Sequence, residues 1–248
     1  MCYQPVVTRD QILITIRKAI NSCSCPIKQL GRFFEELEGI FREKGIFGHA
    51  KRTQKYMTIL YDEMMRDGVY PAEMSEFIRE RLALSVALHD IGKIETPDEI
   101  LNKREVLTKH EKNIIKNHTK FWENWLHESY RPEELDFLKR TVQIAESHHE
   151  KWDGTGGPKG LKGSEIPLAG RMATVVDVYD ALTSTRTYKG HFTHKEACER
   201  IKADSGTYFD PAVVEIFIKN NEKFKDAHVS FLRNIHLSQL APHECRVL

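Results

Sequence analysis

The sequence predicts an all-α fold, and three observations support this prediction. Apolar residues recur at intervals of three and four through most of the chain, which is typical of helices buried on one face. Two capping boxes mark helix starts, Thr108 with Glu111 and Thr193 with Glu196. The one long stretch without a helical pattern is 150–167, which is rich in glycine and therefore predicts a loop.

The elements can be justified in chain order. The helical spacing of apolar residues first appears over 9–20, 27–44, 48–66 and 73–89. Asp210 followed by Pro211 is typical of an N-cap and a first helical residue. The run 168–184 is strongly apolar, and its VVDV centre would suit a strand. Because no partner strand is found nearby, we expect a buried helix there.

Composition narrows the class of protein. The chain has 248 residues, 40% of them hydrophobic and 29% charged, and a formal net charge of +1, which is ordinary for a folded domain. A near-neutral chain creates no surface-wide field for nucleic acid or anionic membranes, so we expect no DNA or RNA partner. No apolar run approaches the roughly 20 residues that span a bilayer. Five cysteines without a pairing framework indicate a reducing compartment. We expect a cytoplasmic protein.

Histidines and aspartates on the predicted helices and at their ends form a candidate metal centre. Its members are His49, His89, Asp90, His118, His148, His149 and Asp177. Seven nitrogen and oxygen ligands are too many for one tetrahedral zinc and too rich in nitrogen for magnesium. Adjacent helical residues point about 100° apart, so we expect His148 and His149 to serve two neighbouring ions. Two ions sharing a bridging aspartate are a common device for cleaving phosphate esters.

Three segments carry a resemblance to a known family. HDIGK (89–93), HHEKWDGTGGP (148–158) and DVYDALTSTRTYK (177–189) together resemble the HD-GYP domain, a branch of the HD phosphohydrolase superfamily. The resemblance implies a helical HD-domain bundle extended by the GYP-type C-terminal helices, and hydrolysis of cyclic di-GMP to pGpG or GMP. We therefore divide the chain into a short helical N-terminal segment of unknown role (1–45), an HD-GYP-like catalytic domain (46–225) and a less regular tail (226–248).

The resemblance also assigns roles. It implies that the seven residues above are metal ligands, and that Asp90 bridges two ions and is catalytic. Lys93 matches the lysine of HDxGK and would stabilise charge on the phosphate. Arg186 and Lys189 match a basic pair that holds substrate phosphate, the arginine through two parallel hydrogen bonds. Asp180, one turn beyond the last ligand, is expected to support the site without binding metal.

The sequence departs from the family pattern in two places. The motif GYP reads GGP here, with Gly157 in place of the tyrosine, which removes an aromatic contact from the loop. Members with three metals carry a glutamate about one turn before the first histidine, near Gly45 in this chain, whereas Glu43 lies two residues away. We therefore expect two divalent ions, iron or manganese in preference, with cobalt, nickel or zinc as alternatives.

The predicted reaction is attack on a phosphodiester by a hydroxide held between the two ions. One alternative is a signalling module that binds a cyclic dinucleotide with little turnover, and another is a phosphodiesterase for cyclic GMP–AMP. The 150–167 loop would form a rim over the site or a docking surface for a protein, or it would be a plain surface connection. The N-terminal helices are a second candidate surface for a protein partner. Trp152 would pack in the core or stack on a base. The sequence also leaves it open whether the protein forms a homodimer.

Overall fold

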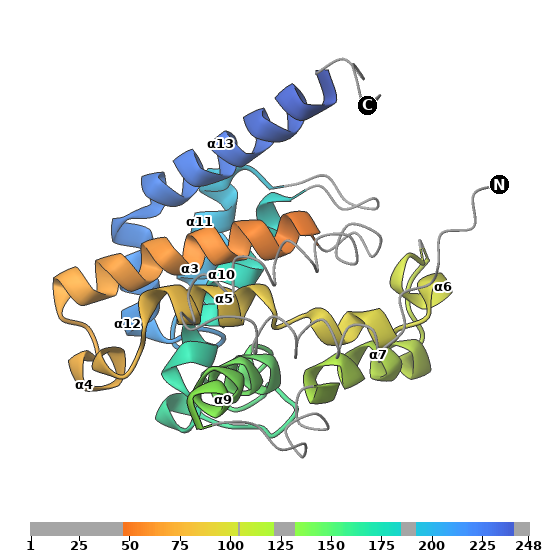
Figure 1. The fold of residues 1–248 in the computed structure, drawn as a ribbon, viewed down its shortest axis with the longest axis horizontal. Coiled ribbons are helices and arrows are strands. Elements are labelled where there is room, and N and C mark those ends of the chain that lie inside the picture. The colour runs from red at the N-terminus through yellow and green to blue at the C-terminus, as the bar shows by residue number, and fades with distance from the viewer. Residues whose placement is uncertain (1–46, 104, 122–131, 185–191, 241–248) are drawn as a thin grey trace.

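A computed structural model describes residues 47–103, 105–121, 132–184 and 192–240 (Figure 1). In these ranges the regular elements are helices, accompanied by one isolated β-bridge between Ser205 and Phe209. The prediction of an all-α fold is confirmed. No helix of the described ranges combines the length and the apolar character needed to cross a bilayer.

The helices follow one another in the order of Figure 1. The α-helices are α3 (Phe47–Asp67), α4 (Pro71–Ser75), α5 (Arg79–Ala87), α6 (Asp98–Leu101), α7 (Lys109–Lys116), α9 (Pro132–Ser147), α10 (Leu168–Thr183), α11 (His194–Ala203), α12 (Pro211–Lys219) and α13 (Asn221–Leu240). Three short 3-10 helices lie between them, η1 (Ile91–Glu95), η2 (Asn117–Lys120) and η3 (Gly163–Glu165).

Two helices organise the bundle. The buried residues of α3 recur every three or four positions, so one stripe of this helix faces the interior. In Figure 1, α3 runs between α13 and α5. Twelve of the sixteen residues of α10 are buried, which places this helix inside the bundle, against α3, α9, α11 and α12. The run 168–184 is thus a buried helix, as expected, and not a strand.

The predicted helix starts are confirmed. Thr108 and Thr193 each accept a hydrogen bond from the backbone N–H three residues on, and the glutamate at that position completes both capping boxes. Asp210 caps α12 by accepting a hydrogen bond from the N–H of Ala212, with Pro211 at the first helical position.

Aromatic packing joins the C-terminal helices to α3 and α10. Tyr56, Tyr179, Phe217 and Phe224 are fully buried, with ring centroids 4.8–6.0 Å apart. Phe224 belongs to α13, which runs across the expected boundary at residue 225. The expectation of an irregular segment after residue 225 is therefore wrong as far as Leu240, because this packing keeps α13 on the bundle. The division into three segments stays a proposal.

Candidate metal centre and active site

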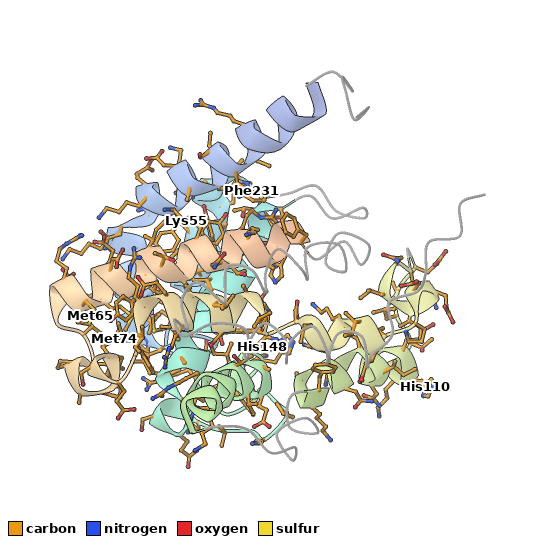
Figure 2. All side chains as sticks on the ribbon, viewed as in Figure 1. Lys55, Met65, Met74, His110, His148 and Phe231 are labelled. Carbon is orange, nitrogen blue, oxygen red and sulfur yellow. The ribbon has the colours of Figure 1, made fainter. Side chains whose placement is uncertain are left out.

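The structure brings all seven predicted ligands together from five parts of the chain. These are the first turn of α3 with His49, the junction of α5 and η1 with His89 and Asp90, η2 with His118, the turn after α9 with His148 and His149, and α10 with Asp177. Figure 2 labels His148, which lies near the middle of the molecule. The side chains are buried or half-buried, except that of His149, which is exposed.

Four of the histidines share one orientation. The Nδ1 atoms of His89, His118 and His148 lie 2.5, 2.6 and 3.0 Å from the backbone carbonyls of Val86, Ile115 and Ile144. The Nδ1 of His49 lies 2.8 Å from Oδ2 of Asp180. A carbonyl or carboxylate oxygen accepts a hydrogen bond, so in its neutral form each ring carries its hydrogen on Nδ1 and leaves the lone pair on Nε2. This is the tautomer that binds a metal through Nε2.

The carboxylate of Asp90 lies between these Nε2 atoms. Its Oδ2 is 3.5 Å from Nε2 of His49 and 3.5 Å from Nε2 of His89. Its Oδ1 faces the other way, 3.2 Å from Nε2 of His118, without hydrogen-bond geometry. His118 and His148 bring their Nε2 atoms within 3.5 Å of each other. One carboxylate oxygen is thus available to each side of the cluster.

The residues present fit metal ions. Three groups of side chains each place their donor atoms within 4.8 Å of one another. These groups are His49 with His89 and Asp177, His118 with His148 and His149, and His89 with Asp90 and His148. Nε2 of His49, Nε2 of His89 and Oδ1 of Asp90 are buried without a hydrogen-bond partner among the described residues. Buried polar atoms rarely stay unpaired, so their convergence indicates that a cation completes the site.

Burial tunes the imidazoles toward metal binding. It holds the pKa of His89 below its ordinary value, and that of His148 well below it. The pKa of His149 is also lowered, to about 4, because the surrounding protein excludes water from its ring even though part of the residue is exposed. These rings are neutral near pH 7, the form that can donate a lone pair to a cation. His49 differs, because the hydrogen bond and charge of Asp180 outweigh burial and raise its pKa.

Two cationic side chains neutralise the buried carboxylates. Arg52 donates to both oxygens of Asp180 at 2.5 and 2.9 Å, and Asp180 in turn orients His49. Asp180 therefore holds the ring of His49 in place, and its supporting role stays a prediction. Lys93 forms an ion pair with Asp90. Burial opposes ionisation of Asp90, but neighbouring groups, led by the charge of Lys93, outweigh it and hold the pKa of this carboxyl well below its usual range.

The rings of His148 and His149 do not diverge as those of adjacent helical residues would, while their service to two ions stays a prediction. Their ring centroids lie 3.9 Å apart, and both belong to the group that contains His118. The reason is that α9 ends at Ser147, so the two histidines occupy a turn to which the angular spacing of a helix does not apply. His148 also belongs to the group with Asp90, so it lies between the two halves of the cluster.

Several predicted features lie outside the described residues. Arg186 and Lys189 fall in the segment 185–191, so the structure does not place them relative to the cluster. Glu43 and Gly45, on which the expected metal count rested, also fall outside these ranges.

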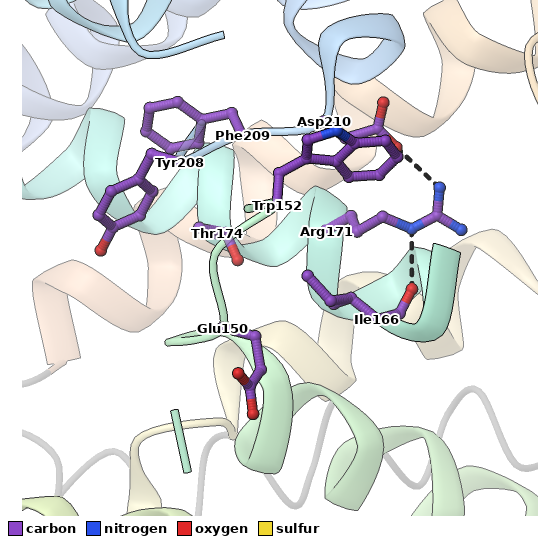
Figure 3. A pocket seen from close by; sticks show the side chains of 8 residues that line it. All are labelled: Glu150, Trp152, Ile166, Arg171, Thr174, Tyr208, Phe209 and Asp210. Atoms are coloured by element: carbon purple, nitrogen blue, oxygen red, sulfur yellow. Dashed lines mark hydrogen bonds and ion pairs between the residues drawn. The ribbon is translucent and has the colours of Figure 1, made fainter. Parts of the chain in front are cut away.

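The glycine-rich loop is tied to the bundle through buried groups. Glu150 is buried and accepts hydrogen bonds from the N–H groups of Lys159 and Leu161 at 2.6 and 3.1 Å. Trp152 donates its backbone N–H to Tyr208 at 3.1 Å. Figure 3 shows the Trp152 ring beside the buried ion pair of Arg171 and Asp210 (2.7 Å), at a small cavity that no metal-ligand candidate lines. Trp152 therefore packs against the protein, and its place argues against stacking on a base at the cluster.

Sequence reasoning overlooked three lysines beside the cluster. Lys112, Lys116 and Lys151 line a cavity that His118 and His149 also line. The available signal was the spacing of Lys112 and Lys116, four residues apart on the helix that leads to His118, which places them on one face.

Comparison with known proteins is consistent with this site. Residues 47–213 match the family described as HD domain. The chain is 41% identical over 184 residues to a cyclic di-GMP phosphodiesterase of Vibrio cholerae, covering 74% of this chain and 37% of that protein. It is 41% identical over 155 residues to a cyclic di-GMP phosphodiesterase of Thermotoga maritima, covering 62% and 41%. A 3'3'-cGAMP-specific phosphodiesterase of Vibrio cholerae is 37% identical over 137 residues, covering 55% and 26%.

The chain thus spans well under half the length of these curated relatives. Among solved structures, an HDG"Y"P protein from Bdellovibrio bacteriovorus aligns with a TM-score of 0.50 at 14% identity, covering 88% of this chain and 73% of that one. At this level of identity the similarity concerns the fold alone.

Proposed function

Because the chain belongs to the HD domain family, we propose that it is a metal-dependent phosphodiesterase that hydrolyses cyclic di-GMP to pGpG, to GMP or to both. The names of the relatives support the substrate class. The observation that carries the proposal is the convergence of free Nε2 atoms around the two oxygens of Asp90. Such a cluster has the ligand types and the spacing for cations and lies beside an open cavity.

We further propose two divalent ions, with iron or manganese favoured by the ligand set. His49, His89 and Asp177 would hold one ion, and His118, His148 and His149 would hold the other. Asp90 would contribute one oxygen to each. When bound, such ions supply Lewis acidity toward a phosphate oxygen and lower the pKa of a water molecule.

The remaining groups of the chain would position the substrate and balance its charge. Lys93, which pairs with Asp90, would stabilise negative charge on a non-bridging phosphate oxygen. Arg186 and Lys189 are proposed to grip the scissile phosphate, on the basis of the sequence motif alone. Asp180 would keep the proton of His49 on Nδ1 throughout, so that Nε2 stays a donor of its lone pair.

A second candidate substrate is 3'3'-cyclic GMP–AMP. The observation that favours it is the identity of 37% to a relative named for this substrate. Both dinucleotides present the same phosphodiester to the cluster and differ in one base, so discrimination would arise at base contacts away from the metals.

The test is hydrolysis of cyclic di-GMP and of 3'3'-cyclic GMP–AMP by anaerobically purified protein, with iron and manganese quantified on the same sample. Turnover that requires metal and stops with a chelator is the expected result, and the ratio of kcat/KM for the two dinucleotides identifies the substrate. Metal bound without turnover of either would point to the binding module and contradict the proposed enzyme. A protein that binds no metal would overturn the site as described.

A further inference from the structure

A cavity of about 480 Å³ opens beside the metal-ligand cluster. His118 and His149 line this cavity and also belong to one of the ligand groups, so the cavity and the cluster are continuous. The other walls come from α7 and from the glycine-rich loop, including Ile115 and Pro158. A substrate held at the cluster would extend into this space.

The cavity is lined by positive charge. Lys112, Lys116 and Lys151 contribute to it, and among the described residues no aspartate or glutamate does. Within the part of the chain that the structure describes, none of the three ammonium groups has an ion-pair partner, although that of Lys151 lies 4.9 Å from the centroid of the Tyr208 ring. Lys103, in the same part of the chain, does have an ion-pair partner, Glu111, at 2.6 Å.

Nearby carboxylates are engaged elsewhere. Glu150 is buried and accepts the backbone N–H groups of Lys159 and Leu161. Asp153 accepts two hydrogen bonds from Thr155, at 2.8 Å from both its N–H and its hydroxyl. Unpaired lysines around a concave surface therefore leave a local site for an anion, although the chain as a whole is near neutral.

Gly157 leaves part of this cavity open. A Cβ at Gly157 would meet no atom within 4 Å, and its φ is not in the left-handed region. The backbone therefore does not require glycine there. Gly156 is different, because a Cβ at that position would lie 2.3 Å from the backbone nitrogen of Lys151. The second glycine of GGP thus widens the space in front of the lysines.

We propose that Lys112, Lys116 and Lys151 form a second anion subsite, which holds the phosphate of the dinucleotide that is not being cleaved. This inference rests on the proposed function. A cyclic dinucleotide carries two phosphodiesters, and the cluster with Lys93 can engage only one of them. The second phosphodiester must lie across the ring of the dinucleotide from the first, and the cavity beside the cluster carries the lysines that would meet it. The apolar wall at Ile115 and Pro158 would contact the sugar or base.

The test compares a substrate with two phosphates and a substrate with one. The double variant Lys112→Gln/Lys116→Gln removes two charges from the cavity without touching a residue adjacent to a ligand. The matched control is Lys109→Gln/Lys120→Gln, which removes the same charge from α7 and η2 at positions that do not line the cavity. The substrates are cyclic di-GMP and bis(p-nitrophenyl) phosphate, a diester with a single phosphate.

We expect the cavity variant to raise KM for cyclic di-GMP about 10- to 100-fold, because each lysine–phosphate contact is charge-assisted. Its preference for cyclic di-GMP over bis(p-nitrophenyl) phosphate, measured as the ratio of kcat/KM, should fall by the same factor. The control variant should match the unmodified protein. An unchanged ratio in the cavity variant, or an equal fall in the control, would overturn the subsite.

Failure of the proposed function would be distinguishable. If the unmodified protein cleaves neither substrate, or cleaves only bis(p-nitrophenyl) phosphate, the proposed activity is wrong. The subsite is then tested by calorimetric titration of the same three proteins with cyclic di-GMP. Binding weakened about tenfold in the cavity variant alone would support the subsite. Equal binding in all three proteins, or no binding at all, would refute it.

Discussion

Asp90 is the residue on which the candidate site depends most. Its Oδ2 faces His49 and His89 at 3.5 Å, while its Oδ1 faces His118 at 3.2 Å. Asp177 belongs to a single ligand group, with one oxygen 3.4 Å from Nε2 of His49 and 3.9 Å from Nε2 of His89. The two aspartates are therefore expected to differ in how many ions their removal affects.

Substitution of each aspartate by asparagine tests this difference. Asp90→Asn should lose both ions and all turnover, since both halves of the cluster share this carboxylate. Asp177→Asn should keep the ion held by His118, His148 and His149, and so bind about half the metal of the unmodified protein. Metal per chain, measured by mass spectrometry after desalting, decides the matter. Full occupancy in Asp90→Asn would contradict a bridging role.

Asp180 acts on the site through His49. Its Oδ2 accepts a hydrogen bond from Nδ1 of that ring at 2.8 Å, and its charge is neutralised by Arg52. Asp180→Asn replaces the carboxylate by an uncharged amide, which no longer balances the charge of Arg52 and offers His49 a weaker hydrogen-bond acceptor. We expect metal affinity to fall about 10- to 100-fold, as is typical when a partner of a ligating histidine is lost. Titration with Mn²⁺ measures this affinity. Asp62→Asn, in the half-exposed pair with Arg79, is the matched control, and an equal effect there would contradict the role of Asp180.

At the scale of the elements, the close approach of η1 and η2 sets the distance between Asp90 and His118. Gly92 makes this approach possible, because a Cβ at that position would lie 2.3 Å from the carbonyl oxygen of His118 and 2.7 Å from Cβ of Phe121. The glycine of HDIGK is therefore required by packing of one backbone against another.

Gly92→Ala should push η2 away from η1. We expect a loss of about 1–3 kcal/mol in the free energy of unfolding, the typical cost of overpacking. Metal affinity should fall as well, since His118 moves with η2. Chemical denaturation and metal titration measure the two effects. Gly157→Ala is the control, because a Cβ there meets open space. Equal behaviour of the two variants would contradict this account of Gly92.

At the scale of the whole molecule, the candidate ligands tie together elements that are distant in the chain. They come from α3, the α5–η1 junction, η2, the turn after α9, and α10. An ion that binds only the folded chain would therefore link most of the bundle, and its binding energy would add to the stability of the fold.

Metal addition should raise the melting temperature. At a concentration 100 times its Kd, an ion stabilises the folded state by about 2.7 kcal/mol per site. For a chain of this size that corresponds to a shift of about 5–11 °C. Calorimetry of the metal-free protein with and without Mn²⁺ measures the shift, and a chelator should reverse it. The Asp90→Asn variant should show little shift. A shift of the same size in that variant would place the stabilising ion elsewhere.

The sequence by itself determined the helical class, the starts of α7, α11 and α12, and the residues that could bind metal. Local physics decides these features. Capping by Thr108, Thr193 and Asp210 involves neighbours within three positions, and the spacing of apolar residues repeats within each helix. The choice of residue types alone, five histidines and two aspartates, predicts the chemistry of the site.

Only the tertiary structure decided how those side chains meet. The convergence of His148 and His149 depends on where α9 ends, and the free Nε2 atoms depend on carbonyls and a carboxylate that orient each ring. The helical continuation of α13 depends on Phe224 finding its place beside Tyr56. Lys112 and Lys151 share a cavity because two distant segments pack side by side. Such contacts depend on the directions and distances between elements that are far apart in the chain. The spacing of residues within one element does not determine them.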